Sequence, residues 1–173
     1  MIIAAKVTEF GFTGIRMEIE TALLFDTVTA RLRELTGRGP TASCMEPENS
    51  DRSEFQYAKE VERKFVGSSG FMFLSAIDHG ACVQKLGIQR RAVRWILGTP
   101  LMAIALLRQD MTSGLFTPVE LLIIDNPVDN GCVVTYVRPS SLILINDSNP
   151  ELKAAAMRLD EKLEALVMDA TQL

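Results

Sequence analysis

The sequence is poor in the residues from which most catalytic and metal-binding sites are built. It has one histidine, His79, and three widely separated cysteines, Cys44, Cys82 and Cys132, that form no C-x-x-C pair. One histidine excludes any site that needs two from the same chain, which removes most zinc hydrolases. An odd number of scattered cysteines indicates no disulfide framework and favours a reduced, cytoplasmic setting. We therefore expect neither a metal nor another cofactor.

Long apolar runs and a strong charge of one sign are also absent. No window approaches 18 apolar residues, and Lys6 and Glu9 interrupt the apolar start of the chain, so neither a transmembrane helix nor a secretion signal is expected. The net charge is −4 and the basic residues are scattered, which argues against a partner with a phosphate backbone. The densest basic cluster, QRRAVR (89–94), is interpreted as a solvated strand edge, with Arg94 kept as a candidate ligand contact. These features predict a cytoplasmic protein that binds neither membranes nor nucleic acid.

What the chain does have is the apolar content of one folded domain, with 47% hydrophobic residues over its 173 positions. The segment TGIRMEIET (13–21) alternates apolar and charged side chains, which is the period of a half-buried strand. The next segment, 22–39, has a helical apolar stripe and two glycines that can end a helix. The stripe consists of Leu24, Val28, Leu32 and Leu35.

Residues 38–68 are predicted to form an insertion made of a loop and a helix. Two prolines and the lack of any periodicity in 40–50 predict a surface loop. Asp51 and Glu54 have the spacing of a capping box, and the helix that they would start runs to Phe65.

Four further strands are predicted after this insertion. FMFLSAI (71–77) is almost continuously apolar, which is typical of a strand covered on both faces, and AVRWIL (92–97) is the next strand. VELLII (119–124) and CVVTYV (132–137) flank the turn-forming pair Asn130-Gly131, so they should form an antiparallel hairpin.

Helices are predicted between and after these strands. A short helix should follow the strand 71–77, and a second, over 100–109, is apolar nearly all round and is therefore expected to be buried. The C-terminal helix, 148–171, starts with the capping-box spacing of Ser148 and Glu151 and carries an apolar stripe that can pack on its own sheet or on a second subunit. The order of elements predicts an α/β protein (α+β, two-layer): one domain over 1–173 with a mixed sheet of about five strands and helices packed on it.

The candidate ligand site lies where two strands end and two helices begin. Asp78-His79 follows the strand 71–77, and Gly98-Thr99-Pro100 follows the strand 92–97. If these strands are parallel neighbours, both helix N-termini point to the same end of the sheet, where their free N–H groups favour a carboxylate, carbonyl or phosphate. The simpler interpretation is that Asp78 and Thr99 only cap their helices.

Two further side chains are candidates for a functional role. An imidazole at His79 could bind a carbonyl or serve as a general acid or base, or it could be a solvated residue of the first helical turn. Tyr136 could contact a ligand, or it could pack in the core with its hydroxyl bonded to a partner.

The order of motifs from Ser75 onward resembles a known family. AIDHGA, Gly87, WILGTP, TPVELLIID, NG and VTYVRP follow one another as in the family catalogued as domain of unknown function three-zero-two, and FDTVTARLRELTG is similar to its first helix. Asp78, His79, Gly98, Pro100 and Tyr136 match its recurring positions, while Thr99 stands where that pattern usually has asparagine. The resemblance implies a two-layer α/β fold that commonly forms a homodimer, and no established activity.

Three functions are consistent with these features. The first is a module that binds a small molecule between the helix N-termini at Asp78-His79 and Gly98-Thr99-Pro100, with Arg94 and Tyr136 as further contacts. The second is a cofactor-independent biosynthetic enzyme, an isomerase, cyclase or lyase, that uses His79 as general acid or base. The third is a structural or protein-interaction domain.

Overall fold

The computed structural model describes residues 5–38, 53–145 and 149–172. Along the described chain the elements are β1 (Arg16–Thr21), α1 (Phe25–Leu35), β2 (Gly37–Arg38), α2 (Glu54–Phe65), β3 (Met72–Asp78), α3 (His79–Gln84), β4 (Ala92–Gly98), α4 (Pro100–Leu107), the 3₁₀ helix η2 (Met111–Leu115), β5 (Val119–Asp125), β6 (Cys132–Val137), α5 (Pro139–Ile143) and α6 (Pro150–Thr171).

The strands form one mixed sheet in the order β1-β6-β5-β4-β3-β2. All neighbouring pairs are antiparallel except β2 and β3, which are parallel. The predicted hairpin is confirmed: β5 and β6 pair in antiparallel register, and Asn130 has the positive φ of 58° that its turn requires. The predicted α/β fold with a mixed sheet is therefore confirmed, with the two-residue strand β2 added at one edge.

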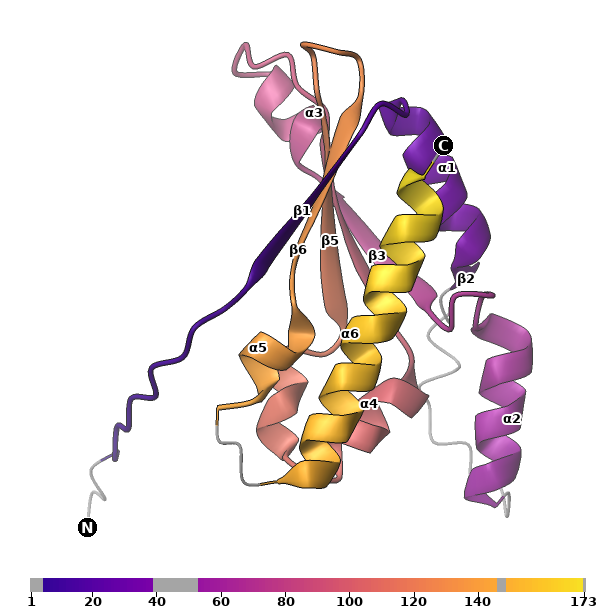
Figure 1. Cartoon of the computed structure of the whole chain (residues 1–173), viewed down its shortest axis with the longest axis vertical. Helices are drawn as coiled ribbons and strands as arrows, with labels where there is room; N and C mark the ends of the chain where they lie inside the picture. Colours follow the sequence, from indigo (N-terminus) through magenta and orange to yellow (C-terminus); the bar gives the residue numbers. More distant parts are fainter. Residues whose placement is uncertain (1–4, 39–52, 146–148, 173) are drawn as a thin grey trace.

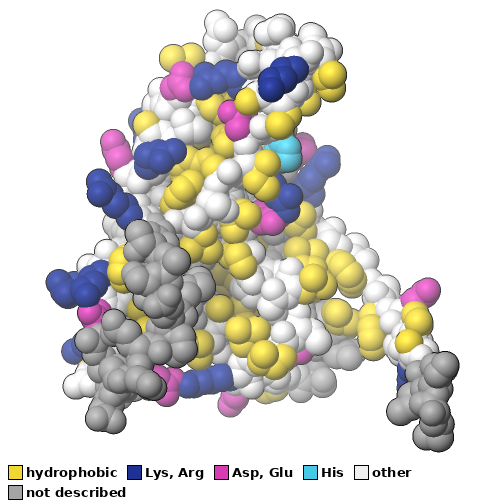
Figure 2. Space-filling model, turned by 180° about the vertical axis from the view of Figure 1, so that it is seen from behind, with side chains coloured by type: hydrophobic (Ala, Val, Ile, Leu, Met, Phe, Trp, Pro, Cys, Tyr) yellow, Lys and Arg dark blue, Asp and Glu magenta, His cyan; other side chains and the backbone are white. Residues whose placement is uncertain are grey.

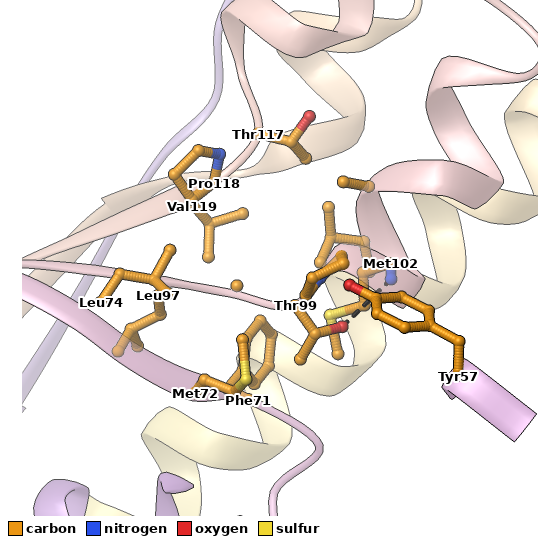
Figure 3. A pocket seen from close by; sticks show the side chains of 14 residues that line it. Tyr57, Phe71, Met72, Leu74, Leu97, Thr99, Met102, Thr117, Pro118 and Val119 are labelled. Atoms are coloured by element: carbon orange, nitrogen blue, oxygen red, sulfur yellow. Dashed lines mark hydrogen bonds between the residues drawn. The ribbon is translucent and has the colours of Figure 1, made fainter. Parts of the chain in front are cut away.

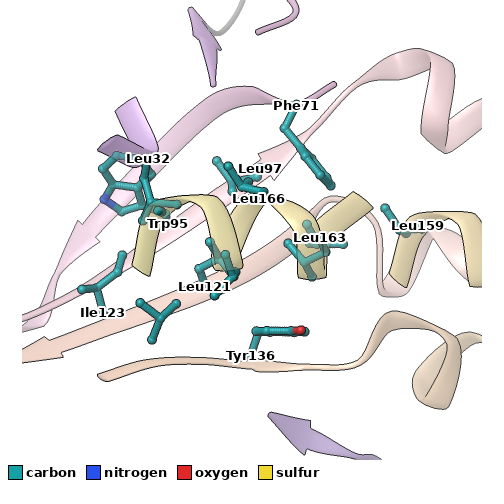
Figure 4. Close-up of a cluster of buried hydrophobic side chains, with 14 of the residues drawn as sticks. Leu32, Phe71, Trp95, Leu97, Leu121, Ile123, Tyr136, Leu159, Leu163 and Leu166 are labelled. Carbon is teal, nitrogen blue, oxygen red and sulfur yellow. The ribbon is translucent and has the colours of Figure 1, made fainter. Parts of the chain in front are cut away.

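The core lies between one face of this sheet and the helices α1 and α6 (Figure 1). Alternate residues of the central strands point to this side, among them Trp95 and Leu97 of β4 and Leu121 and Ile123 of β5, each at most 2% exposed. Figure 4 shows them packed against the apolar stripe of α6. That stripe is the predicted one, since all six of its members are buried: Leu152, Ala156, Leu159, Leu163, Leu166 and Ala170.

The other face of the sheet is open to solvent, and the prediction that the strand 71–77 is covered on both faces is wrong. Residues 75–78 of β3 are exposed, and Ile77 keeps 44% of its surface accessible. Ile77 and Leu122 flank Arg94 in one cross-strand row of this face. Figure 2 shows hydrophobic side chains scattered over this side between charged groups. The apolar run of β3 therefore does not mean a second layer of helices.

Helix α4 is also less buried than predicted. Of its eight residues only Leu106 is buried. Figure 1 shows the reason: α4 lies at one end of the sheet beside α6, so only part of its surface is covered.

The N-caps of α2 and α6 lie one or two residues beyond the predicted caps. Ser53, not Asp51, starts α2: its hydroxyl accepts the Gln56 N–H at 3.3 Å while the Gln56 side chain accepts the Ser53 N–H at 3.1 Å. At α6, Asn149 Oδ1 accepts the N–H groups of Glu151 and Leu152, both at 3.0 Å. The predicted caps Asp51 and Ser148 lie outside the described residues.

Two glycines let the chain cross itself where the segment that follows α1 meets the segment that follows α2. The N–H groups of Gly37 and Gly67 both donate to the carbonyl oxygen of Phe71, each at 2.9 Å. A Cβ on Gly67 would lie 2.3 Å from the backbone nitrogen of Gly37, and a Cβ on Gly37 would lie 1.8 Å from the carbonyl oxygen of Phe65. Only glycine fits at either position without moving the backbone of its neighbour.

Candidate functional site

The structure separates the two halves of the predicted ligand site. β3 and β4 are neighbours, but they are antiparallel: Met72 pairs with Gly98, and Asp78 pairs with Val93. Six residues of strand, at about 3.3 Å each, therefore place Asp78-His79 roughly 20 Å from Gly98-Thr99. The prediction that one ligand lies between these two helix N-termini is wrong, because it depended on parallel strands.

At the first end, Asp78 acts as the N-cap of α3. Its carboxylate accepts the N–H of Ala81 at 2.9 Å, as the sequence suggested. Helix α3 has only six residues, and His79 at its start is exposed. Within the described part of the chain no hydrogen bond or ion pair holds the imidazole, so no neighbouring carboxylate orients it for proton transfer. The catalytic role of His79 stays a prediction.

Three of the predicted residues do meet at a cleft of about 510 Å³. His79, Arg94 and Tyr136 all line it, together with Arg16 and Glu120. The guanidinium of Arg94 is paired with the carboxylate of Glu120 rather than free to bind an anion.

Tyr136 belongs mainly to the core. It is 6% exposed and packs among the buried side chains beneath α6 (Figure 4). Burial, with a smaller contribution from the nearby Glu164 carboxylate, raises the pKa of its phenol. The core-packing interpretation of Tyr136 therefore describes its position better than the ligand-contact interpretation.

The second end of β4 opens onto an apolar cavity of about 280 Å³. Gly98, Thr99 and Pro100 all line it. Thr99 is 6% exposed, and its hydroxyl accepts the Met102 N–H at 3.1 Å, which confirms it as the N-cap of α4. Pro100 occupies the first helical position, where its missing N–H leaves no bond unmade.

Most of the cavity wall is aliphatic, aromatic or thioether surface (Figure 3). Its remaining lining residues are Tyr57, Phe71, Met72, Leu74, Leu97, Met102, Ala103, Thr117, Pro118, Val119 and Leu159. Tyr57 reaches in from α2 on the side of Thr99, so the two hydroxyls lie toward the same part of the wall (Figure 3). A Cβ at Gly98 would lie 3.1 Å from the Cβ of Pro118, so the glycine allows the proline to close this side tightly.

A second cavity of about 230 Å³ adjoins the first, because Thr99, Met102 and Leu159 line both. Together the two have the size usual for small-molecule sites, about 300 to 1,000 Å³. Unlike the first, the second is also lined by charged side chains, namely Arg158 and Lys162 of α6 and Glu62 of α2.

The sequence patterns did not predict two residues that line this cavity and are distant in sequence from Gly98-Thr99-Pro100. Tyr57 comes from the predicted insertion and Leu159 from the stripe of the C-terminal helix. The position of Leu159 in an apolar stripe predicts that it is buried, but it does not predict that it borders a cavity. Tyr57 lies outside the apolar stripe of α2, so the periodicity does not indicate its role.

The described residues hold no group of three histidine, cysteine, aspartate or glutamate side chains placed to bind a metal ion. No helix among them is both long enough and apolar enough to cross a membrane.

The cysteines that the structure describes differ in burial. Cys132 is 1% exposed, and burial raises the pKa of its thiol to about 11, so only about one molecule in a thousand is thiolate at pH 8. Cys82 is exposed on α3, and Cys44 lies outside the described residues. We expect iodoacetamide at pH 8 to label Cys82 and to leave Cys132 unlabelled until urea unfolds the chain, as measured by peptide mass spectrometry. Equal labelling rates for Cys82 and Cys132 in the folded protein would contradict the buried position of β6.

Comparison with known proteins identifies the family. No curated protein matches the sequence. A crystal structure of an uncharacterized conserved protein DUF302 from Bacillus stearothermophilus is similar in fold, with a TM-score of 0.61 and 16% sequence identity over 91% of this chain and 98% of that one. The family model for the domain of unknown function DUF302 matches residues 49–170, well over half of the chain. The chain therefore belongs to the DUF302 family, as the order of its motifs had indicated.

Proposed function

We propose that this protein binds a small, largely apolar molecule in the cavity at the Gly98-Thr99-Pro100 junction. The observation that carries the proposal is the lining of that cavity: apolar side chains from β3, β4, α4 and α6 form most of the wall, and hydroxyls are contributed by Thr99, Thr117 and Tyr57. None of the described residues that line it is charged. Concave apolar sites with a few polar groups are the usual form of small-molecule sites. The ligand thus belongs to one end of the sheet, not between its two ends.

A neutral ten-carbon alcohol, 1-decanol, is the first probe. We expect it to raise the melting temperature of the full chain, since a ligand at 100 times its dissociation constant stabilises the folded state by about 2.7 kcal/mol. Differential scanning fluorimetry and calorimetric titration measure the effect. If neither 1-decanol nor a panel of apolar metabolites binds, the proposal fails.

A cavity-filling variant tests the location. Ala103→Phe adds a ring inside the cavity, so it should weaken 1-decanol binding at least tenfold while the protein stays folded. Ala154→Phe makes the same change at an exposed position of α6 and should bind as the unaltered protein does. A folded Ala103→Phe protein with undiminished binding would place the ligand elsewhere.

A further inference from the structure

We infer that the ligand is a single-chain amphiphile with an anionic head, its chain in the first cavity and its head at Arg158 and Lys162 in the second. The inference rests on the proposed function, which it deepens by naming the ligand class. It starts from the arrangement of the two cavities. Thr99, Met102 and Leu159 line both, so the two cavities lie next to each other and share part of their wall.

The polarity of the lining residues changes from the first cavity to the second. Among the residues that the structure describes, those lining the first cavity are all uncharged, whereas those lining the second include two cations, Arg158 and Lys162, and one anion, Glu62. A ligand that fills both spaces must therefore be apolar at one end and negatively charged at the other.

The two cations are placed and available for one head group. They lie four residues apart on α6, which puts them one turn apart on the same side of the helix. Both residues are exposed, and among the described residues neither takes part in a hydrogen bond or an ion pair. The position that a Cβ on Gly70 would take is 3.3 Å from the ammonium nitrogen of Lys162, so this cation lies against the backbone that borders the cavity.

Two cations held close together repel each other, and an anion between them relieves that repulsion. A carboxylate or phosphate can also accept hydrogen bonds from both side chains. Glu62 neutralises only part of this charge and disfavours a doubly charged head near α2. The arrangement thus favours a singly charged head such as a carboxylate.

Decanoate and 1-decanol separate the head group from the chain, because they share the ten-carbon chain and differ in charge. We expect the full-length protein to bind decanoate about tenfold more tightly than 1-decanol at low ionic strength, in calorimetric titrations at pH 8. This preference should shrink as salt is added, because salt screens exposed charges. Equal affinity for the two probes would overturn the inference and leave the proposed function intact, whereas failure of both to bind would overturn both.

The double variant Arg158→Gln/Lys162→Gln tests the assigned cations. It should lose the preference for decanoate and keep its affinity for 1-decanol. The control, Lys6→Gln/Lys85→Gln, removes the same charge from exposed residues that line neither cavity, and it should keep the preference. If the Arg158/Lys162 variant still prefers decanoate as strongly as the control does, these two cations do not bind the head.

Discussion

Replacing Gly67 by alanine should destabilise the protein by at least about 3 kcal/mol, the upper part of the range for overpacked sites. The added Cβ would lie 2.3 Å from both the nitrogen of Gly37 and the carbonyl oxygen of Leu35. Because these are backbone atoms, no side-chain rotation can relieve the overlap. The two chain segments that cross at Gly37 and Gly67 must therefore move apart. The hydrogen bonds that the N–H groups of Gly37 and Gly67 donate to the carbonyl oxygen of Phe71 would then lengthen. Urea unfolding followed by circular dichroism measures the loss.

Gly11→Ala is the matched control, because a Cβ there meets nothing within 4 Å. It should change the free energy of unfolding by less than about 0.5 kcal/mol. Gly37→Ala should be as damaging as Gly67→Ala, and the double variant should lose less than the sum of the two, since one opening of the crossing accommodates both methyl groups. A Gly67→Ala protein as stable as Gly11→Ala would show that the crossing is looser than described.

Trp95→Ala should lower the free energy of unfolding by about 3 to 5 kcal/mol, as expected for a buried aromatic residue cut back to alanine. Trp95 is 2% exposed and meets Phe73 edge to face, with ring centroids 4.8 Å apart. The guanidinium of Arg33 lies 5.3 Å from the Trp95 ring and 5.4 Å from the Phe73 ring, so one cation covers both aromatic residues. The alanine variant loses the contact area, the ring pair and part of this cation–π contact together.

Circular dichroism is the suitable measurement here, because Trp95 is the only tryptophan and its variant has no indole fluorescence to follow. Trp95→Phe keeps a ring against Phe73 and should lose clearly less stability than Trp95→Ala. Leu115→Ala removes a side chain that is 81% exposed and should change stability by less than about 0.5 kcal/mol. A Trp95→Ala loss below about 1 kcal/mol would mean that this part of the sheet is not packed as described.

Local features of the fold could be predicted from the sequence because each follows from a few neighbouring residues. The alternation in 13–21 indicated the half-buried strand β1, Asn130-Gly131 indicated the hairpin, and Thr99-Pro100 indicated the start of α4. Capping, turn geometry and periodicity act over short stretches of chain, so the pattern and the structure agree there.

The candidate site depended on a longer-range property, the relative direction of β3 and β4, which no local pattern carries. A parallel connection needs a crossover of a dozen or more residues, usually with a helix packed on the sheet. The connection here, residues 79–91, is long enough for a crossover, but its helix α3 has only six residues, and Figure 1 shows this helix near one end of the sheet rather than lying along its face as α6 does. The chain therefore turns back, and Asp78 and Thr99 cap helices at opposite ends of the sheet. The cavity at Thr99 could not be predicted either, because Tyr57 and Leu159 reach it from distant segments.

The place of β1 in the sheet has a consequence for folding during synthesis. β1 is made before the other strands that the structure describes, yet its partner in the sheet is β6, so that Arg16 meets Val137 more than a hundred positions later. At 5 to 20 residues per second, the ribosome needs on the order of ten seconds to add the intervening residues. Met17 and Ile19 must stay without their sheet partners Tyr136 and Val134 for that time. Of the described strands, β1 thus leaves the ribosome first and is among the last that can join the native sheet, and this long-range pairing slows folding of the domain.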